Sequence, residues 1–187
     1  ANTTASSNVA VGRMAVRDNT TGASNTAIGH QAMIVNTTGG SNVAVGKGAL
    51  DANTEGGSNT ALGTGALGAN TTASNNTAVG KNSMELNSTG ASNTAVGSGS
   101  LGSNSTASNN TAVGKAALNS TTTGANNTAV GREAMLSNTT GASNVGIGST
   151  SLDANTEGDY NTAVGQASLT TATTASHNTG IGYAALQ

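Results

Sequence analysis

The chain has 187 residues, with no Cys, Pro, Trp or Phe and only 7% charged residues. Leu, Ile, Val and Phe together number 26, a fraction low enough to suggest disorder, but the formal net charge of −2 lacks the imbalance that usually accompanies disorder. Without Cys, neither disulfides nor thiolate metal sites can form. The near-neutral charge disfavours a nucleic-acid partner, and since no run of about 18 apolar residues exists, we expect no membrane insertion of this segment.

A glycine recurs every 17 residues from Gly12 to Gly182, each time at the end of a motif related to N-T-A-V-G. A disordered polymer has no reason to hold this interval. Stacked coils do, because one extra residue would turn every later side chain to the wrong face. The interval predicts a single repeat domain over residues 1–187, made of eleven 17-residue coils, and we expect it to be a fragment of a longer fibrous protein.

The repeat unit reads N-T-A-V-G-x-x-A-L-x-x-N-T-T-G-A-S, and its segments predict the elements of one coil in chain order. T-A-V is β-branched and short, as in a strand. G-x-x predicts a turn, A-L a second short strand, and N-T-T-G-A-S a second turn. No segment has the length or the 3.6-residue period of a helix. We therefore expect an all-β parallel β-solenoid of eleven coils, with two short strands and two turns in each coil.

Three columns of the repeat are nearly invariant and are expected to form structural ladders along the rod. They are the Asn before the strand, the aliphatic residue that ends it, and the Gly that follows. A column of Asn one coil apart can hydrogen-bond along the rod and tolerates a left-handed turn. The ladder residues named for these columns are Asn25, Asn42, Asn59, Asn76, Asn93, Asn110, Gly29, Gly46, Gly63, Gly80, Gly97, Gly114, Val45, Val79, Val96 and Val113.

The column in the middle of the strand contains only Ala or Gly. A position facing open solvent would accept larger polar side chains, so the restriction indicates close approach by another sheet or another chain. We expect it to face partner chains in a homo-oligomer, and threefold symmetry is a natural closed arrangement of parallel rods. The alternative is a thin monomeric solenoid whose two sheets meet through Ala. The interface candidates are Ala27, Ala44, Ala61, Ala78, Ala95, Ala112 and Ala129.

The N-T-A-I-G motif at 25–29 and the S-N-V-A-V-G motif at 41–46 resemble the head repeats of trimeric autotransporter adhesins of the YadA type. Similar N-T-A-V-G-x-x-A-L arrays look like those of phage tail-fibre proteins. The resemblance covers essentially all of the chain and implies a left-handed parallel β-roll in which three chains form the head. One departure is the repeat length, since the adhesin repeat is typically shorter than 17 residues.

Three weaker patterns offer alternative sites. The Thr rows of N-T-T, interrupted by Glu55 and Glu157, could order water as in an ice-binding solenoid. Asp51 with Glu55 in D-A-N-T-E-G, and Asp153 with Glu157 in its second copy, could supply oxygen ligands to a hard cation. A sparse basic column follows the invariant Gly and could contact anionic sugars, although such a column is usually a solvated edge that discourages sheet pairing. That basic column comprises Arg13, Lys47, Lys81, Lys115 and Arg132, with His30 among them.

Catalytic residues are not evident in the sequence. His30 and His177 occupy different columns about nine coils apart, and no Gly-rich phosphate loop with Lys followed by Ser or Thr is present. We therefore expect no enzyme, no cofactor and no bound metal. The sequence favours an extracellular rod or head of a surface fibre, in a bacterial adhesin contributing to virulence or in a phage, that attaches to a host receptor, matrix protein or glycan. The alternatives are a non-adhesive spacer and an ice-binding solenoid.

Overall fold

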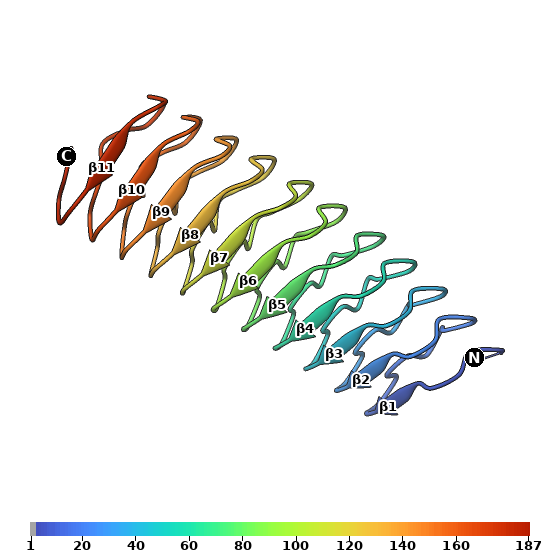
Figure 1. The fold of residues 1–187 in the computed structure, drawn as a ribbon. Coiled ribbons are helices and arrows are strands. Elements are labelled where there is room, and N and C mark those ends of the chain that lie inside the picture. Colours follow the sequence, from blue (N-terminus) through green and yellow to red (C-terminus); the bar gives the residue numbers. More distant parts are fainter. Residues whose placement is uncertain (1–2) are drawn as a thin grey trace.

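The computed structural model describes residues 3–187 and shows an elongated rod of stacked coils, with the two termini at opposite ends (Figure 1). Each coil contributes one three-residue strand, and the eleven strands form one parallel sheet in sequence order. The strands are β1 (Val9–Val11), β2 (Thr26–Ile28), β3 (Val43–Val45), β4 (Thr60–Leu62), β5 (Thr77–Val79), β6 (Thr94–Val96), β7 (Thr111–Val113), β8 (Thr128–Val130), β9 (Val145–Ile147), β10 (Thr162–Val164) and β11 (Thr179–Ile181).

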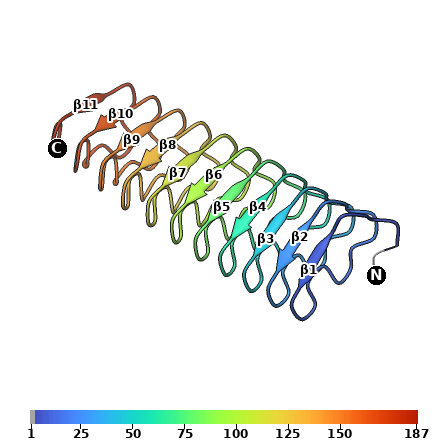
Figure 2. The same cartoon turned by 60° about the horizontal axis from the view of Figure 1, so that its bottom comes forward.

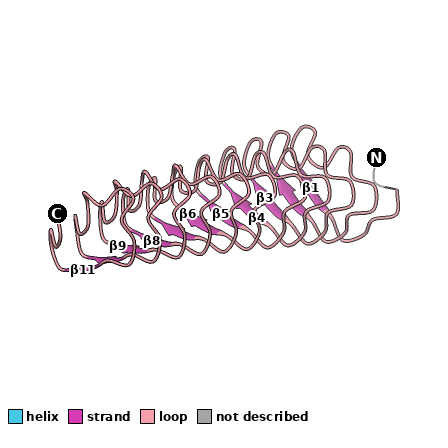
Figure 3. Ribbon diagram, turned by 90° about the horizontal axis from the view of Figure 1, so that it is seen from above, coloured by secondary structure: helices cyan, strands magenta, loops and turns pink. Residues whose placement is uncertain are grey.

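Neighbouring strands pair in register at an offset of 17 residues, so that Ala78 of β5 lies opposite Ala95 of β6. The ladder continues just beyond the strands. The Thr94 N–H donates to the Asn110 carbonyl at 2.8 Å, and the Gly97 N–H donates to the Val79 carbonyl at 2.7 Å. The predicted parallel β-solenoid with a 17-residue coil is therefore confirmed, and residues 3–187 form no helix. All eleven strands lie along one side of the rod, while turns and loops make up the rest (Figures 2 and 3).

The second predicted strand, centred on A-L, is absent, because this segment forms a turn. Two residues in each such turn have positive φ angles, for example Asn82 at 55° and Met84 at 47°. This left-handed conformation curls the chain, which cannot then extend as a strand. The turn still bonds to its neighbours, since the Met84 N–H donates to the Ser100 carbonyl at 2.9 Å and the Asn82 N–H donates to the Thr64 carbonyl at 3.0 Å.

The core is a narrow stack of small and medium side chains enclosed by each coil. It contains the Ala in the middle of the strand, the Ala or Ser three residues after the invariant Gly, and the Leu or Met that follows. In the coil of β7, Ala112, Ala117 and Leu118 are all fully buried. The Leu and Met side chains are the largest groups in this core, and burying each one supplies about 1.5–3 kcal/mol.

The expectation that the Ala column faces a partner chain is wrong. Ala27, Ala44, Ala61, Ala78, Ala95, Ala112 and Ala129 are all fully buried inside their own chain. The reason for their small size is visible at Gly146, where an added Cβ would lie 2.8 Å from Met135 Cγ and 3.1 Å from Ser151 Oγ. The close neighbour that limits this column is therefore the opposite wall of the same solenoid.

The aliphatic column that ends each strand runs along the rod as expected for a ladder, but it points outward and not into the core. Val96 is 36% exposed, Val113 37% and Leu62 45%, whereas Val45 and Val79 are half-buried. Adjacent residues of a strand point to opposite faces, so an inward Ala requires an outward aliphatic residue. This column therefore contributes an outer face and not a core ladder.

The invariant Gly marks the corner between the strand and the turn. Gly80 has a φ of +135°, a conformation that L side chains rarely adopt, and an added Cβ would lie 2.6 Å from the backbone of Gly97 in the next coil. The same holds along the column of Gly29, Gly46, Gly63, Gly80, Gly97 and Gly114. Only glycine lets successive corners approach this closely.

Candidate functional site

The outer face of the sheet carries a continuous line of outward aliphatic side chains, which we call the aliphatic ridge. It runs the full length of the sheet, one residue per coil, next to a column of Thr or Val on the same outer face. At a coil spacing of about 4.8 Å the ridge is roughly 50 Å long. Its members are Val11, Ile28, Val45, Leu62, Val79, Val96, Val113, Val130, Ile147, Val164 and Ile181.

The Asn column before the strand lies inside the rod and joins three coils. In coils β2–β7 these Asn residues are buried. The Asn93 side chain accepts the Asn110 N–H at 2.9 Å and donates from Nδ2 to the Ala107 carbonyl at 2.8 Å, while the Asn93 N–H donates to Asn76 Oδ1. The bonds are thus mainly from side chain to backbone. The left-handed position falls one residue earlier, for example at Ser92, where φ is 58°.

A second Asn column, which the sequence pattern placed only within a turn, forms the side-chain ladder. Asn53 Nδ2 donates to Asn36 Oδ1 at 2.7 Å, and Asn70 Nδ2 donates to Asn53 Oδ1 at 2.9 Å. Each Nδ2 also donates to a carbonyl three residues later, as Asn53 does to Gly56 at 3.0 Å. The signal was the Asn of N-T-T itself, which recurs in almost every coil. The two Asn columns together line one end of each coil, which we call the amide end.

This second ladder is interrupted where Thr121 and Ala172 replace Asn. The two buried side-chain oxygens without a hydrogen-bond partner in residues 3–187 are Asn104 Oδ1 and Asn155 Oδ1. Asn104 lies one coil before Thr121, and Asn155 lies one coil before Ala172. Each orphaned oxygen therefore lacks the Asn Nδ2 of the next coil that would have donated to it. The orphaned oxygens therefore have a local structural cause and do not indicate a ligand.

The Thr rows of N-T-T divide into two kinds of position. The first Thr uses its hydroxyl in the stack, as Thr37 Oγ1 donates to the Thr54 carbonyl at 2.9 Å. The second Thr is exposed, and its row is broken by the exposed Glu55 and Glu157. One row of hydroxyls is thus already engaged by backbone, and the other lies at a turn and not on the flat sheet.

The charged residues make few contacts with one another. The two ion pairs within residues 3–187 join sequence neighbours, Arg17 with Asp18 at 2.6 Å and Arg132 with Glu133 at 2.8 Å. Hydrogen bonding to Arg17 lowers the pKa of Asp18. Both pairs are exposed to solvent, so each contributes little to stability.

The D-A-N-T-E-G segments do not assemble a cation site. Asp51 lies beside the turn after the strand, whereas Glu55 lies at the amide end of the same coil. Burial raises the pKa of Asp51, and it also raises that of Asp153. Within residues 3–187, the structure brings no three His, Asp or Glu side chains together in a group that could hold a metal ion.

A shallow groove runs along the turns that follow β2 to β7. It consists of two hollows that share Asn82, Glu85 and Leu86. The first hollow is floored by Gly65 and Gly68. The complete set of residues that line the two hollows is Gln31, Lys47, Gly48, Asp51, Ala52, Thr64, Gly65, Gly68, Ala69, Lys81, Asn82, Glu85, Leu86, Ser98, Gly99, Gly102, Ser103 and Asn119.

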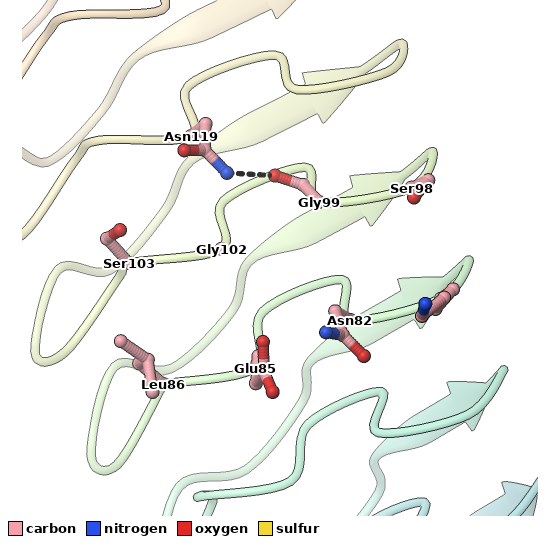
Figure 4. A pocket seen from close by; sticks show the side chains of 9 residues that line it. Asn82, Glu85, Leu86, Ser98, Gly99, Gly102, Ser103 and Asn119 are labelled. Atoms are coloured by element: carbon pink, nitrogen blue, oxygen red, sulfur yellow. Dashed lines mark hydrogen bonds between the residues drawn. The ribbon is translucent and has the colours of Figure 1, made fainter.

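The second hollow is shown from close by in Figure 4. It is floored by Gly99 and Gly102, with Glu85 from the coil before and Asn119 from the coil after. Asn119 Nδ2 donates to the Gly99 carbonyl at 2.7 Å across the glycine pair. Lys47 and Lys81 of the predicted basic column form one bank of this groove. The structure thus brings them next to acidic residues that come from another column of the repeat.

The two histidines lie far apart along the chain, and His30 adjoins Gln31 of the groove lining. His177 is exposed and its ring stacks on Tyr160, with 5.0 Å between ring centroids. His30 is half-buried in the basic column, more than eight coils before His177. Within residues 3–187 there is also no helix long and apolar enough to pass through a membrane.

Comparisons of the chain with family models, with curated proteins and with solved structures give no match. The likeness of its motifs to adhesin head repeats and to phage fibre arrays thus stays a prediction, and the ridge and the groove must be interpreted from their own chemistry.

Proposed function

We propose that the chain is the rod or head region of an extracellular surface fibre, of a bacterium or a virion, and that three copies assemble through their aliphatic ridges as a homotrimer of left-handed β-rolls. The observation that carries this proposal is the unbroken, outward line of aliphatic side chains along the sheet. Contiguous apolar surface of this extent on a protein with so few large apolar residues marks an interaction site.

The shape of the ridge favours three copies. It is a single aliphatic column, with more polar Thr residues beside it in most coils. Three such ridges meeting at one axis cover each other from two sides, whereas two ridges would leave one flank of each exposed. Parallel rods related by a closed rotation also bring the same coil of every chain to the same level, so identical residues meet along the axis.

The fibre role is supported by the way the fold extends. Each coil contacts only its neighbours, so a solenoid gains length by adding repeats. Weak contacts repeated at each coil and on each of three chains would attach the fibre to a host receptor, a matrix protein or a glycan through multivalency. The resemblance to adhesin heads and phage fibres points the same way.

A ridge variant tests the assembly. The triple substitution Val96→Glu, Val113→Glu and Val130→Glu places charges on outward positions, so each coil keeps its buried core. Light scattering of the parent should give three times the 17.8 kDa of one chain, and the variant should give a single chain with an unchanged β-rich circular dichroism spectrum. Gln166→Glu, at an exposed position beside the ridge, serves as the control and should stay trimeric. A parent that is monomeric at all concentrations would overturn the trimer.

A second experiment separates attachment from spacing. The trimeric parent, labelled with a fluorophore, should bind host cells or immobilised glycans, and the monomeric ridge variant should bind far less because it lacks multivalency. If neither binds any cell or glycan surface, the chain acts only as a spacer. An ice-binding role predicts thermal hysteresis by the monomer, and its absence at millimolar concentration excludes that role.

A further inference from the structure

The residues of the groove repeat every two coils, which is twice the period of the fold. Along its bank, Lys alternates with a hydroxyl residue in successive coils. The bank residues in order are Lys47, Thr64, Lys81 and Ser98, and Lys115 continues their column one coil beyond the lining of the hollows. On the floor, a carboxylate or amide alternates with Gly, and the residues in order are Asp51, Gly68, Glu85, Gly102 and Asn119. Because both alternations are in phase, chemically equivalent groups recur about every 9.6 Å along the rod.

The charges of this groove are not neutralised by each other. The two ion pairs within the described residues lie outside it, so Lys47 and Lys81 form none with Asp51 or Glu85. The three lysines are exposed, and Glu85 is exposed beside the shared centre of the two hollows. A groove that presents lysines without ion-pair partners on one bank and side-chain acceptors on its floor is suited to a ligand that carries both anions and hydrogen-bond donors.

Two of the floor glycines, Gly68 and Gly102, are not required by backbone strain, whereas Gly65 and Gly99 have a φ of +67°. Gly68 and Gly102 have no positive φ, and an added Cβ at Gly68 would meet its nearest atoms at 3.4 to 3.7 Å, an ordinary contact distance. The same column accepts Ile34 and Leu136 elsewhere in the rod. The fold therefore permits a larger residue at Gly68, and at Gly102 it does so if the Asn119 side chain moves, since an added Cβ there would lie 2.7 Å from Asn119 Nδ2. The absence of side chains at these two positions is what opens the hollows.

We propose that this groove binds a linear polysaccharide in which an acidic sugar alternates with a neutral one. Each extended disaccharide of such a polymer spans about the same distance as two coils, so one carboxylate per disaccharide would meet Lys47, Lys81 and Lys115 in turn. The neutral sugars would lie over the glycine floors and donate hydroxyl or amide hydrogens to Asp51, Glu85 and Asn119. The inference deepens the proposed attachment role, since it names the class of receptor and the surface that contacts it.

The floor also limits which polyanions fit. Asp51 and Glu85 would repel a densely sulfated chain, while they can accept hydrogen bonds from a neutral sugar. The groove contains no aromatic side chain on which a sugar ring could stack, so each disaccharide should bind weakly. Affinity should therefore grow with oligosaccharide length until the three lysines are all engaged, and should grow again on assembly into a multivalent fibre.

Calorimetric titration with hyaluronan oligosaccharides of increasing length tests the proposal. The parent should bind with an affinity that rises up to about three disaccharides. Lys47→Ala, Lys81→Ala and Lys115→Ala together should weaken binding by about tenfold, since three exposed charge contacts are lost. Gly68→Leu with Gly102→Leu should abolish binding by filling both hollows. The matched controls are Arg13→Ala with Arg132→Ala in the basic column, and Thr170→Leu in the floor column outside the groove, and both should bind as the parent does.

Three outcomes would overturn the proposal: no binding of any length, binding of heparin that the Arg13 and Arg132 changes weaken as much as the lysine changes, or retained binding after the hollows are filled. Circular dichroism of each variant shows whether its fold is intact, and Gly102→Leu can be replaced by Gly102→Ser if the larger residue disturbs Asn119. Because the groove lies on the turns and not on the ridge, the light-scattering mass should be the same for all these variants. Loss of glycan binding with an intact trimer thus separates this inference from the proposed assembly.

Discussion

The two ends of each coil form the hydrogen bonds between stacked coils in different ways. At the amide end, buried Asn side chains complete the hydrogen bonds of the backbone, as the Asn93 side chain does for the Ala107 carbonyl and the Asn110 N–H, and the Asn76 side chain for the Asn93 N–H. At the end with the Gly-x-x turn, backbone groups bond directly from coil to coil, as Asn82 N–H does to the Thr64 carbonyl. Side chains are thus fixed at the first end and free to vary at the second, which is where the groove occurs.

The largest effect is expected from overpacking the core that joins both ends. Ala112→Leu inserts three carbon atoms where the opposite wall leaves no room, and should lower the free energy of unfolding by about 1–3 kcal/mol or more. Urea denaturation of the monomeric ridge variant, with and without this change, measures the effect. Because the residue lies inside one chain, the loss should be present in the monomer. A loss seen only in the trimer would mean that this column faces a partner after all.

At the amide end, Asn93→Ala should cost about 1–3 kcal/mol, because it leaves the buried Asn110 N–H without its acceptor and removes one of the two donors to the Ala107 carbonyl, the other being Asn104 Nδ2. Ser98→Ala, on the variable end, is the matched control and should change stability by less than about 0.5 kcal/mol. Denaturant titration of both variants checks the contrast. Equal effects at the two positions would show that the two ends of the coil are stabilised in the same way.

A repair of the second Asn ladder should stabilise the rod. Thr121→Asn supplies a donor to the orphaned Asn104 Oδ1 and a second one to the Gly124 carbonyl, for a gain of about 1 kcal/mol. Ala172→Asn does the same for Asn155. Ser120→Asn, one residue before the interruption and less buried, is the control and should give no gain. A Thr121→Asn protein no more stable than its parent would mean that water already satisfies the orphaned oxygen.

The smallest expected effect concerns pH. Burial raises the pKa of Asp51 in the folded protein, so the native state holds this proton more tightly than the unfolded chain does. Stability therefore decreases as the pH rises through the unfolded pKa of about 3.9 towards the folded value. Asp51→Asn should raise the melting temperature slightly at pH 7 and leave it unchanged near pH 3. Glu55→Gln, exposed at the amide end of the same coil, is the control. A gain for Asp51→Asn that is equal at both pH values would contradict burial of the charged carboxylate as the cause.

The sequence was sufficient to predict the solenoid, because a 17-residue interval without insertions allows little else. It did not determine which face of T-A-V is inward. A tight interface and a tight core would each require a small residue at Ala112. Only the positions of Met135 and Ser151 around Gly146 show that the core is the cause. The second strand was wrongly predicted because Leu67 and Met84 adopt left-handed backbone angles that these residue types do not normally favour. The two-coil period of the groove was present in the sequence, but the columns that compose it became neighbours only in the fold.

The most direct test of the central claim uses the fact that the chain has no cysteine. Val113→Cys places a thiol on the ridge, and Ser98→Cys places one on an exposed turn beside it. In a trimer joined at its ridges, mild oxidation should link Val113→Cys chains in pairs, since disulfides need Cβ atoms about 3.8 Å apart, and should leave Ser98→Cys chains unlinked. If the Val113→Cys thiol is instead alkylated rapidly and forms no interchain disulfide, the ridge faces solvent and the proposed assembly is wrong.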